Sequence, residues 1–307
     1  MTWYSLKSLS SHRAALFLVA LAVVGCNEPF GPKGPFVQRF VAYAVLDARA
    51  DTQYVRLYLN YNPPNYDPHA VPGEQYDTTA VVTISSTSQN YVFHDTLLPS
   101  SIHAFVNRTF RPQPGSSYSL SATSSRGAIS AETQIPGSGS LAVQNQSTLL
   151  FPSSFPTGNV EVQGILATST RGFLVRFIFV YSLASDSTVR HEIEIPMSYE
   201  QNSAGASAPV YPQLQRNTGP NPIIDFPVSS FLQVIADLTD LNATRVLMKQ
   251  AKFYLVQVDE PLYNYYNVAN GFQDKFSIRT DQPDYTNIQN GYGVFGSFNV
   301  DSLIIHY

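Results

Sequence analysis

Residues 54–61 read Tyr54-Val55-Arg56-Leu57-Tyr58-Leu59-Asn60-Tyr61, and they decide the fold class. The apolar side chains of Val55, Leu57 and Leu59 fall on one face of an extended chain, whereas Arg56 and Asn60 fall on the other. Such a period of two residues is typical of a β-strand with one buried face. This stretch therefore predicts a sheet that covers a core.

Further strands are predicted on both sides of this stretch. They are residues 37–46, 80–85, 91–97, 118–123 and 129–135, and the quoted stretch itself belongs to a strand over 53–61. Proline- and glycine-rich turns separate them, as at Pro72-Gly73 and Pro112-Gln113-Pro114-Gly115. A parallel sheet would need intervening helices of about ten or more residues, and the sequence has no apolar repeat of that kind here. Residues 37–136 are thus expected to form an antiparallel β-sandwich of the immunoglobulin or fibronectin type.

A composition change follows at Pro136-Gly137-Ser138-Gly139-Ser140. Small and rigid residues of this kind suit a domain junction, although a long surface loop is the alternative. Strands are expected again over 160–168, 172–183, 189–197 and 251–259, with a long polar region at 198–225 and an apolar run at 231–238. Residues 137–307 are therefore predicted to be a second β-rich domain with one or two short helices.

One of these helices is expected to begin at Glu260-Pro261-Leu262, directly after the strand that ends at Asp259. Aspartate is a favoured N-cap residue and proline is favoured in the first turn, so Asp259 is predicted to cap this helix. The surface of the helix is mostly tyrosine, at Tyr263, Tyr265 and Tyr266.

The N-terminus has the features of a lipoprotein signal peptide. Lys7 and Arg13 precede the apolar run 14–24, which ends in Val23-Val24-Gly25-Cys26. The run is about half of the ~20 apolar residues that span a bilayer, and the chain's single cysteine follows a small residue. We expect cleavage after residue 25 and a lipid on Cys26, which would anchor the protein to a membrane.

Residues 26–36 are rich in proline and glycine and are predicted to be a tether. Asn27, next to the cysteine, fits sorting to the outer membrane of a didermal bacterium; the side of that membrane stays open. Without Lys7 and Arg13 the chain keeps 16 basic residues against 22 acidic ones, a formal charge of −6. Nucleic acid is therefore not expected as a partner, because its phosphates require clustered lysine and arginine.

No catalytic or metal-binding pattern stands out. His69, His94, His103, His191 and His306 are dispersed, and Glu192 and Glu194 lie on the strand face opposite His191, so these three residues cannot hold one ion together. Gly137-Ser138-Gly139-Ser140 lacks the register and the strand-to-helix context of a nucleophile loop. The sequence predicts a protein that is not an enzyme and needs no metal or cofactor.

The end of the chain, Asn287-Ile288-Gln289-Asn290-Gly291-Tyr292-Gly293-Val294-Phe295-Gly296, resembles the domain-of-unknown-function 4249 family of lipoproteins, found mostly in Bacteroidota. The cysteine motif and Ala131-Glu132-Thr133-Gln134-Ile135-Pro136 precede this block in the order that the family shows. The resemblance implies no particular activity. It implies an outer-membrane location and a TonB-dependent transporter as a partner, because such lipoproteins are often encoded beside these transporters.

The terminal block has two interpretations. Gly291, Gly293 and Gly296 let strands approach closely, which is a structural role. Alternatively, the block and the tyrosine-rich helix form an aromatic groove for a ligand or protein. The candidate binding residues of that groove are Tyr263, Tyr265, Tyr266, Asn287, Tyr292 and Phe295.

Three functions stay open at this point. The first is a non-catalytic accessory of a TonB-dependent uptake transporter, which captures ligand or docks on the barrel. The second is a free-standing module that binds glycan or peptide, or mediates adhesion. The third is a hydrolase whose acids or Ser-His pair converge only in the folded protein.

Overall fold

The computed structural model describes residues 36–63, 73, 75–99, 101–201, 205–270 and 285–307. The chain divides into two units, residues 1–38 and 39–307. In the first unit, residues 36–38 are exposed and have no regular secondary structure. The predicted signal peptide, Cys26 and nearly all of the tether lie outside the described residues.

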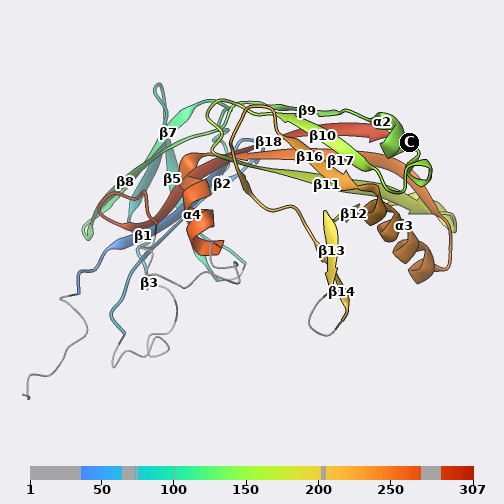
Figure 1. Ribbon diagram of the computed structural model, residues 1–307. Coiled ribbons are helices and arrows are strands. Elements are labelled where there is room, and N and C mark those ends of the chain that lie inside the picture. The colour runs from blue at the N-terminus through green and yellow to red at the C-terminus, as the bar shows by residue number, and fades with distance from the viewer. Residues whose placement is uncertain (1–35, 64–72, 74, 100, 202–204, 271–284) are drawn as a thin grey trace, which may run out of the picture. The chain divides into compact units, whose positions relative to one another are not determined.

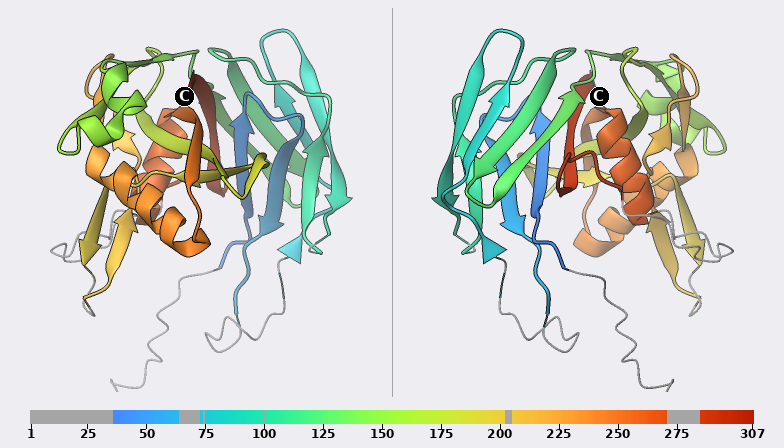
Figure 2. Two further views of the ribbon diagram at one scale, coloured as in Figure 1. Left: turned by 90° about the vertical axis from the view of Figure 1, so that its right-hand side faces the viewer. Right: turned by 90° about the vertical axis from the view of Figure 1, so that its left-hand side faces the viewer.

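The first part of the second unit is an antiparallel β-sandwich (Figures 1 and 2). One layer contains β1 (Phe40–Asp47), β2 (Gln53–Leu59), β3 (Gln75–Tyr76) and β6 (His103–Asn107). The other contains β4 (Val81–Ser85), β7 (Ser117–Ser124) and β8 (Gly127–Gln134). β5 (Asn90–Leu97) links the layers, because its first half pairs with β4 and its second half with β6.

A first hydrophobic core fills the space between these layers. Val55, Leu57 and Leu59 are buried in it, as their alternation predicts. The ring of Phe110 is completely buried, and its centroid lies 4.2 Å from that of Tyr91 and 5.2 Å from that of Tyr118. Apolar burial of this kind is the main favourable contribution to folding.

Residues after 139 build a second two-layer arrangement. One layer contains β12 (Asp186–Glu194), β11 (Gly172–Leu183), β17 (Val246–Val258) and β18 (Tyr292–His306). The other contains β16 (Ile223–Pro227), β10 (Asn159–Ile165) and β9 (Ser140–Val143). Helix α2 (Gln146–Leu150), a 3-10 turn η3 (Pro152–Ser154) and helix α3 (Val228–Asn242) accompany this second layer.

The second core lies between these layers and is rich in phenylalanine. The ring of Phe177 lies 4.6 Å from that of Phe253 and 5.4 Å from that of Phe231. Phe231 belongs to α3, so the apolar run 231–238 is helical. The buried residues Phe231, Val234 and Leu238 recur at intervals of three and four, which is the period of a helix.

Strand β18 belongs to both arrangements. Residues 292–298 pair with β1, and residues 298–306 pair with β17. The pairing with β1 is parallel, whereas the strands of residues 37–136 pair with one another in antiparallel fashion, as the sequence predicts. A parallel pair needs a long connection, and here nearly the whole chain provides it, since Val41 is the partner of Tyr292.

The polar region 198–225 contains its own strands. β13 (Ser198–Gln201) and β14 (Ser207–Val210) form a hairpin, which Figure 1 shows near α3. β15 (Gln215–Arg216) pairs with the start of β11. The protein is thus mainly β, with an N-terminal antiparallel sandwich followed by a β-rich part that carries short helices, as the sequence predicts.

Buried side chains hold the predicted junction around Gly137 in place. The Gln257 side chain donates to the Gly137 carbonyl (3.3 Å) and to Asp301 Oδ2 (2.9 Å), and it accepts from the Ala167 N–H (2.8 Å). Asn299 Nδ2 also donates to the Gly137 carbonyl, at 3.1 Å. The domain boundary near residue 136 stays a prediction, and the chain crosses it through an ordered, hydrogen-bonded segment.

Candidate functional site

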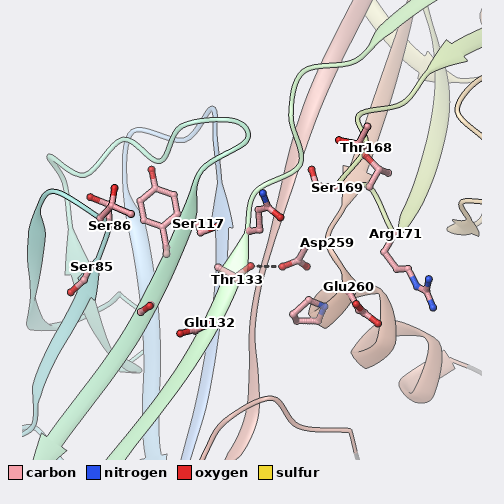
Figure 3. A pocket seen from close by; sticks show the side chains of 16 residues that line it. Ser85, Ser86, Ser117, Glu132, Thr133, Thr168, Ser169, Arg171, Asp259 and Glu260 are labelled. Atoms are coloured by element: carbon pink, nitrogen blue, oxygen red, sulfur yellow. Dashed lines mark hydrogen bonds between the residues drawn. The ribbon is translucent and has the colours of Figure 1, made fainter.

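A polar cleft of about 700 Å³ lies between residues of the first sandwich and residues of the β-rich part (Figure 3). This volume falls within the range of ligand-binding clefts, about 300–1,000 Å³. Hydroxyl side chains dominate its lining, which consists of residues 85–87, 117–119, 132–134, 168–171 and 259–261. The composition favours a ligand that forms many hydrogen bonds.

The sandwich wall of the cleft is a row of outward-facing polar side chains. Ser85 on β4 is the partner of Ser119 on β7, and Ser119 is the partner of Glu132 on β8. Ser117 and Gln134 form the next outward pair along β7 and β8. Partners on adjacent strands lie about 4.8 Å apart in the hydrogen-bonding direction, so the row is regular.

The opposite wall comes from the turn before β11 and from the start of helix α4 (Glu260–Asn270). Figure 3 shows Thr168, Ser169 and Arg171 on this side, with Glu260 near Arg171. The Arg171 Nε atom is buried and has no hydrogen-bond partner among the described residues. An unpaired buried donor of this kind costs free energy.

Asp259 joins the two walls. Its Oδ2 accepts hydrogen bonds from the hydroxyls of Thr133 on β8 and of Ser297 on β18, the latter at 3.1 Å; Figure 3 shows the bond to Thr133. The side chain is almost entirely buried, with 2% of the residue exposed. Burial raises the pKa of Asp259 to about 6, and the hydrogen bonds from Thr133, Leu262 and Ser297 limit the rise.

The other carboxylate oxygen of Asp259 caps α4. Oδ1 accepts from the Leu262 N–H at 2.9 Å, which is the N-cap interaction that the sequence predicts. Because the chain itself uses both oxygens, we assign Asp259 a structural role.

The three predicted tyrosines of α4 point to different surroundings. The Tyr263 ring packs against Gly172, where an added Cβ would lie 2.3 Å from Cδ2 of Tyr263. The Tyr265 ring lies 5.9 Å from that of Tyr43, which in turn lies 6.1 Å from that of Tyr58. Tyr266 is 42% exposed.

The remaining predicted groove residues are divided between structure and surface. Asn287 Oδ1 accepts from the Phe295 N–H (2.9 Å), and its Nδ2 donates to the carbonyls of Phe295 (2.8 Å) and Glu132 (3.1 Å). The Phe295 side chain is fully buried in the first core, so it does not reach a groove. Tyr292 is 43% exposed, and the Arg39 guanidinium lies 5.8 Å from its ring centroid.

The structural interpretation of the glycines agrees with the geometry. A Cβ on Gly296 would lie 2.8 Å from Leu262 Cβ, so Gly296 lets α4 pack on β18. Gly293 has φ +105°, and a Cβ there would lie 2.0 Å from the Ala42 carbonyl oxygen of β1. Binding of a ligand by the tyrosines and the terminal block stays a prediction, and Tyr265 gathers with Tyr43 and Tyr58 instead of with residues 287–296.

The acidic residues near His191 form ion pairs on the sheet surface. Glu192 Oε1 lies 2.5 Å from Lys252 Nζ, and Glu194 Oε2 lies 2.5 Å from Arg176 Nη2. Within the described part of the chain, no group of three or more His, Cys, Asp or Glu residues is placed to hold a metal ion. The described helices include none that is both long and apolar enough to cross a membrane.

Two β cores that share one strand and border a polar cleft define a β-sandwich protein with a candidate binding site. The chain belongs to the family described as Domain of unknown function (DUF4249), whose model matches residues 28–304. A search of curated proteins finds no match.

Among solved structures, the chain is similar to a crystal structure of chicken CNTN1 FN1-FN3 domains. The match has 11% sequence identity and a TM-score of 0.22, and it covers 72% of this chain and 62% of that chain. At this TM-score the likeness carries no argument about fold or function.

Proposed function

We propose that the protein is a non-catalytic, lipid-anchored protein of the outer membrane that assists a TonB-dependent uptake transporter by capturing ligand. The observation that carries the binding role is the cleft between the two cores. Within the described residues, the side chains of Ser119, Glu132 and Glu260 make no hydrogen bond to the chain, so their capacity is available to a ligand. The cysteine motif at residue 26 and the membership in the family support the location and the partner.

The role of Asp259 supports a binding function over hydrolysis. A general acid or base must reach the substrate with an available oxygen, and the chain engages both oxygens of this carboxylate. Glu132 and Glu260 line the cleft and are exposed, so their carboxylates can accept hydrogen bonds from a ligand.

The test is extraction of the native protein from its own outer membrane with a mild detergent. Mass spectrometry then identifies the proteins that co-purify with it in stoichiometric amount. We expect a TonB-dependent barrel in the preparation. The matched variant, Cys26→Ala, should leave the membrane fraction, because it has no thiol to acylate. Recovery of the wild-type protein alone, with no barrel after chemical cross-linking in intact cells, would contradict the transport role and favour a free-standing binder.

A further inference from the structure

We infer that the cleft binds a neutral oligosaccharide, held by the serine row of the sandwich wall and by the charged side chains Glu132, Arg171 and Glu260. This inference rests on the binding role proposed above and names the chemical class of the ligand. It depends on three features of the cleft: its hydrogen-bonding groups, its charge and the residues that form its walls.

The hydrogen-bonding groups match a ligand that both donates and accepts. A serine or threonine hydroxyl can do either, a carboxylate only accepts, and a guanidinium only donates. Ser85, Ser119 and Glu132 lie side by side across three strands, and Thr168 and Arg171 lie on the other wall. Every hydroxyl of a sugar is both donor and acceptor, so successive sugar hydroxyls can pair with successive members of this row.

The charge of the cleft disfavours anionic ligands. Two exposed carboxylates, Glu132 and Glu260, and the buried Asp259 outnumber the single guanidinium of Arg171. An anionic ligand would meet this excess of negative charge, and like charges placed together cost free energy. A neutral ligand can instead use the carboxylates as acceptors and the guanidinium as a donor, in charge-assisted hydrogen bonds that are stronger than neutral ones.

The walls also disfavour a peptide ligand. Peptide recognition relies on pockets for apolar side chains or on a free strand edge. The only aromatic lining residue among those described, Tyr118, is buried in the first core, and its hydroxyl accepts from the Gln113 N–H at 2.9 Å. The sandwich wall presents the face of β4, β7 and β8, in which the central strand β7 is paired on both of its edges.

The inference predicts binding of neutral oligosaccharides by the full chain in a detergent whose headgroup contains no sugar. A glycan array of neutral, uronic-acid and sialylated oligosaccharides, with extended peptides beside them, gives the first readout. Isothermal titration of the best ligand then gives the affinity. We expect a neutral glycan to bind, and to bind more tightly than its acidic counterpart.

Two variants test the site. Ser119→Tyr places a ring in the middle of the serine row, and Glu132→Gln removes the acceptor charge next to it; each should weaken binding at least tenfold. Thr123→Tyr is the matched control, because Thr123 is exposed on the same face of β7 but outside the cleft, and it should bind as the native chain does. A single unfolding transition for each variant verifies the fold.

Three results would overturn the inference: preferential binding of acidic glycans or peptides, no binding by any neutral glycan, or tight binding that survives Ser119→Tyr. A TonB-dependent barrel that co-purifies with a chain that binds no glycan would reject the saccharide class and leave the transport role intact. Glycan binding by a chain that co-purifies with no barrel would reject the transport role and leave the saccharide class intact.

Discussion

A single buried carboxylate connects three segments that are far apart in the sequence. Asp259 caps α4 through the Leu262 N–H and accepts from hydroxyls on β8 and β18. The price of this arrangement is the removal of an ionisable group from water, which raises the pKa of Asp259 to about 6. Its contribution to stability must therefore depend on pH.

The sign of this dependence follows from the pKa. Because the folded-state pKa of about 6 lies above the ordinary value of 3.8, folding disfavours the ionised form. The contribution of Asp259 to the free energy of unfolding is thus most favourable below about pH 4 and declines as the pH rises to about 6. Above pH 6 the cost is constant.

We predict that Asp259→Asn removes this dependence. The asparagine Oδ1 can still accept from the Leu262 N–H and keep the cap. Relative to the native chain, the variant should gain about 2 kcal/mol in the free energy of unfolding between pH 4.5 and pH 7.5, measured by urea denaturation. Asp186→Asn is the control with the opposite sign, because the side-chain hydrogen bond from Thr188 lowers the pKa of Asp186. Parallel pH profiles of native and Asp259→Asn chains would disprove the pKa argument.

Among the elements, the position of helix α4 depends on the absence of a side chain at Gly296 of β18. No side chain stands between Gly296 and Leu262, and an added Cβ would lie 2.8 Å from Leu262 Cβ and 3.1 Å from the Leu262 backbone. The helix therefore packs directly on the strand, and through Tyr265 it reaches the ring of Tyr43 on β1.

Gly296→Ala is expected to lower the free energy of unfolding by about 1–3 kcal/mol, because the helix must shift away from the strand. Gly219→Ala is the matched control: an added Cβ at Gly219 meets no atom within 4 Å. It should change stability by less than about 0.5 kcal/mol. Chemical denaturation of both variants provides the measurement, and equal stabilities would show that α4 does not depend on Gly296.

The segment around Gly137 depends on Gln257, whose side chain is completely buried. Gln257→Ala leaves the Ala167 N–H and the Thr170 hydroxyl without their acceptor, at 2.8 Å each in the native chain. Such losses cost about 1–3 kcal/mol per buried group. We expect a protease to cleave the variant faster than the native chain within residues 136–140. Limited proteolysis, with the fragments identified by mass spectrometry, provides the measurement. An unchanged cleavage rate at this segment would mean that the backbone pairs of β9 are sufficient to hold it.

Long alternating stretches were predictable from the sequence, and the short or distant features were not. β1, β2, β11 and β17 follow their apolar patterns, and the Asp259 cap follows its residue type. β6 has five residues and β9 four, too few for a period of two to stand out. The helical spacing of Phe231, Val234 and Leu238 was readable in the sequence.

The cleft could not be read from the sequence, because it depends on register. Ser85, Ser119 and Glu132 are ordinary outward residues of three strands, and only the pairing of β4, β7 and β8 aligns them. The tyrosines of α4 were identifiable by type, but their neighbours Tyr43 and Tyr58 come from strands more than 200 residues earlier.

On the scale of the whole molecule, β18 makes the two cores interdependent. Its first half contributes Phe295 to the first core, and its second half places Leu303 and Ile305 against the second. Residues 37–136 alone would therefore leave the β1 edge uncovered, and exposed edges promote association between chains.

We predict that a fragment of residues 37–136 aggregates or unfolds without cooperativity, and that fusion of residues 285–299 through a flexible linker restores a monomer. Size-exclusion chromatography shows whether the fragment and the fusion are monomers, and thermal unfolding shows whether each unfolds cooperatively. A fusion with the same residues in scrambled order controls for added length. A monomeric, cooperatively unfolding 37–136 fragment would instead establish the sandwich as an independent domain.

The position of β18 also governs when the protein can fold. A ribosome makes β18 long after its partner β1, so the first sheet stays incomplete until β18 has left the exit tunnel. Pairing across so large a sequence separation is slow to form. The topology of the folded chain itself therefore delays completion of the first sheet until β18 has been synthesised.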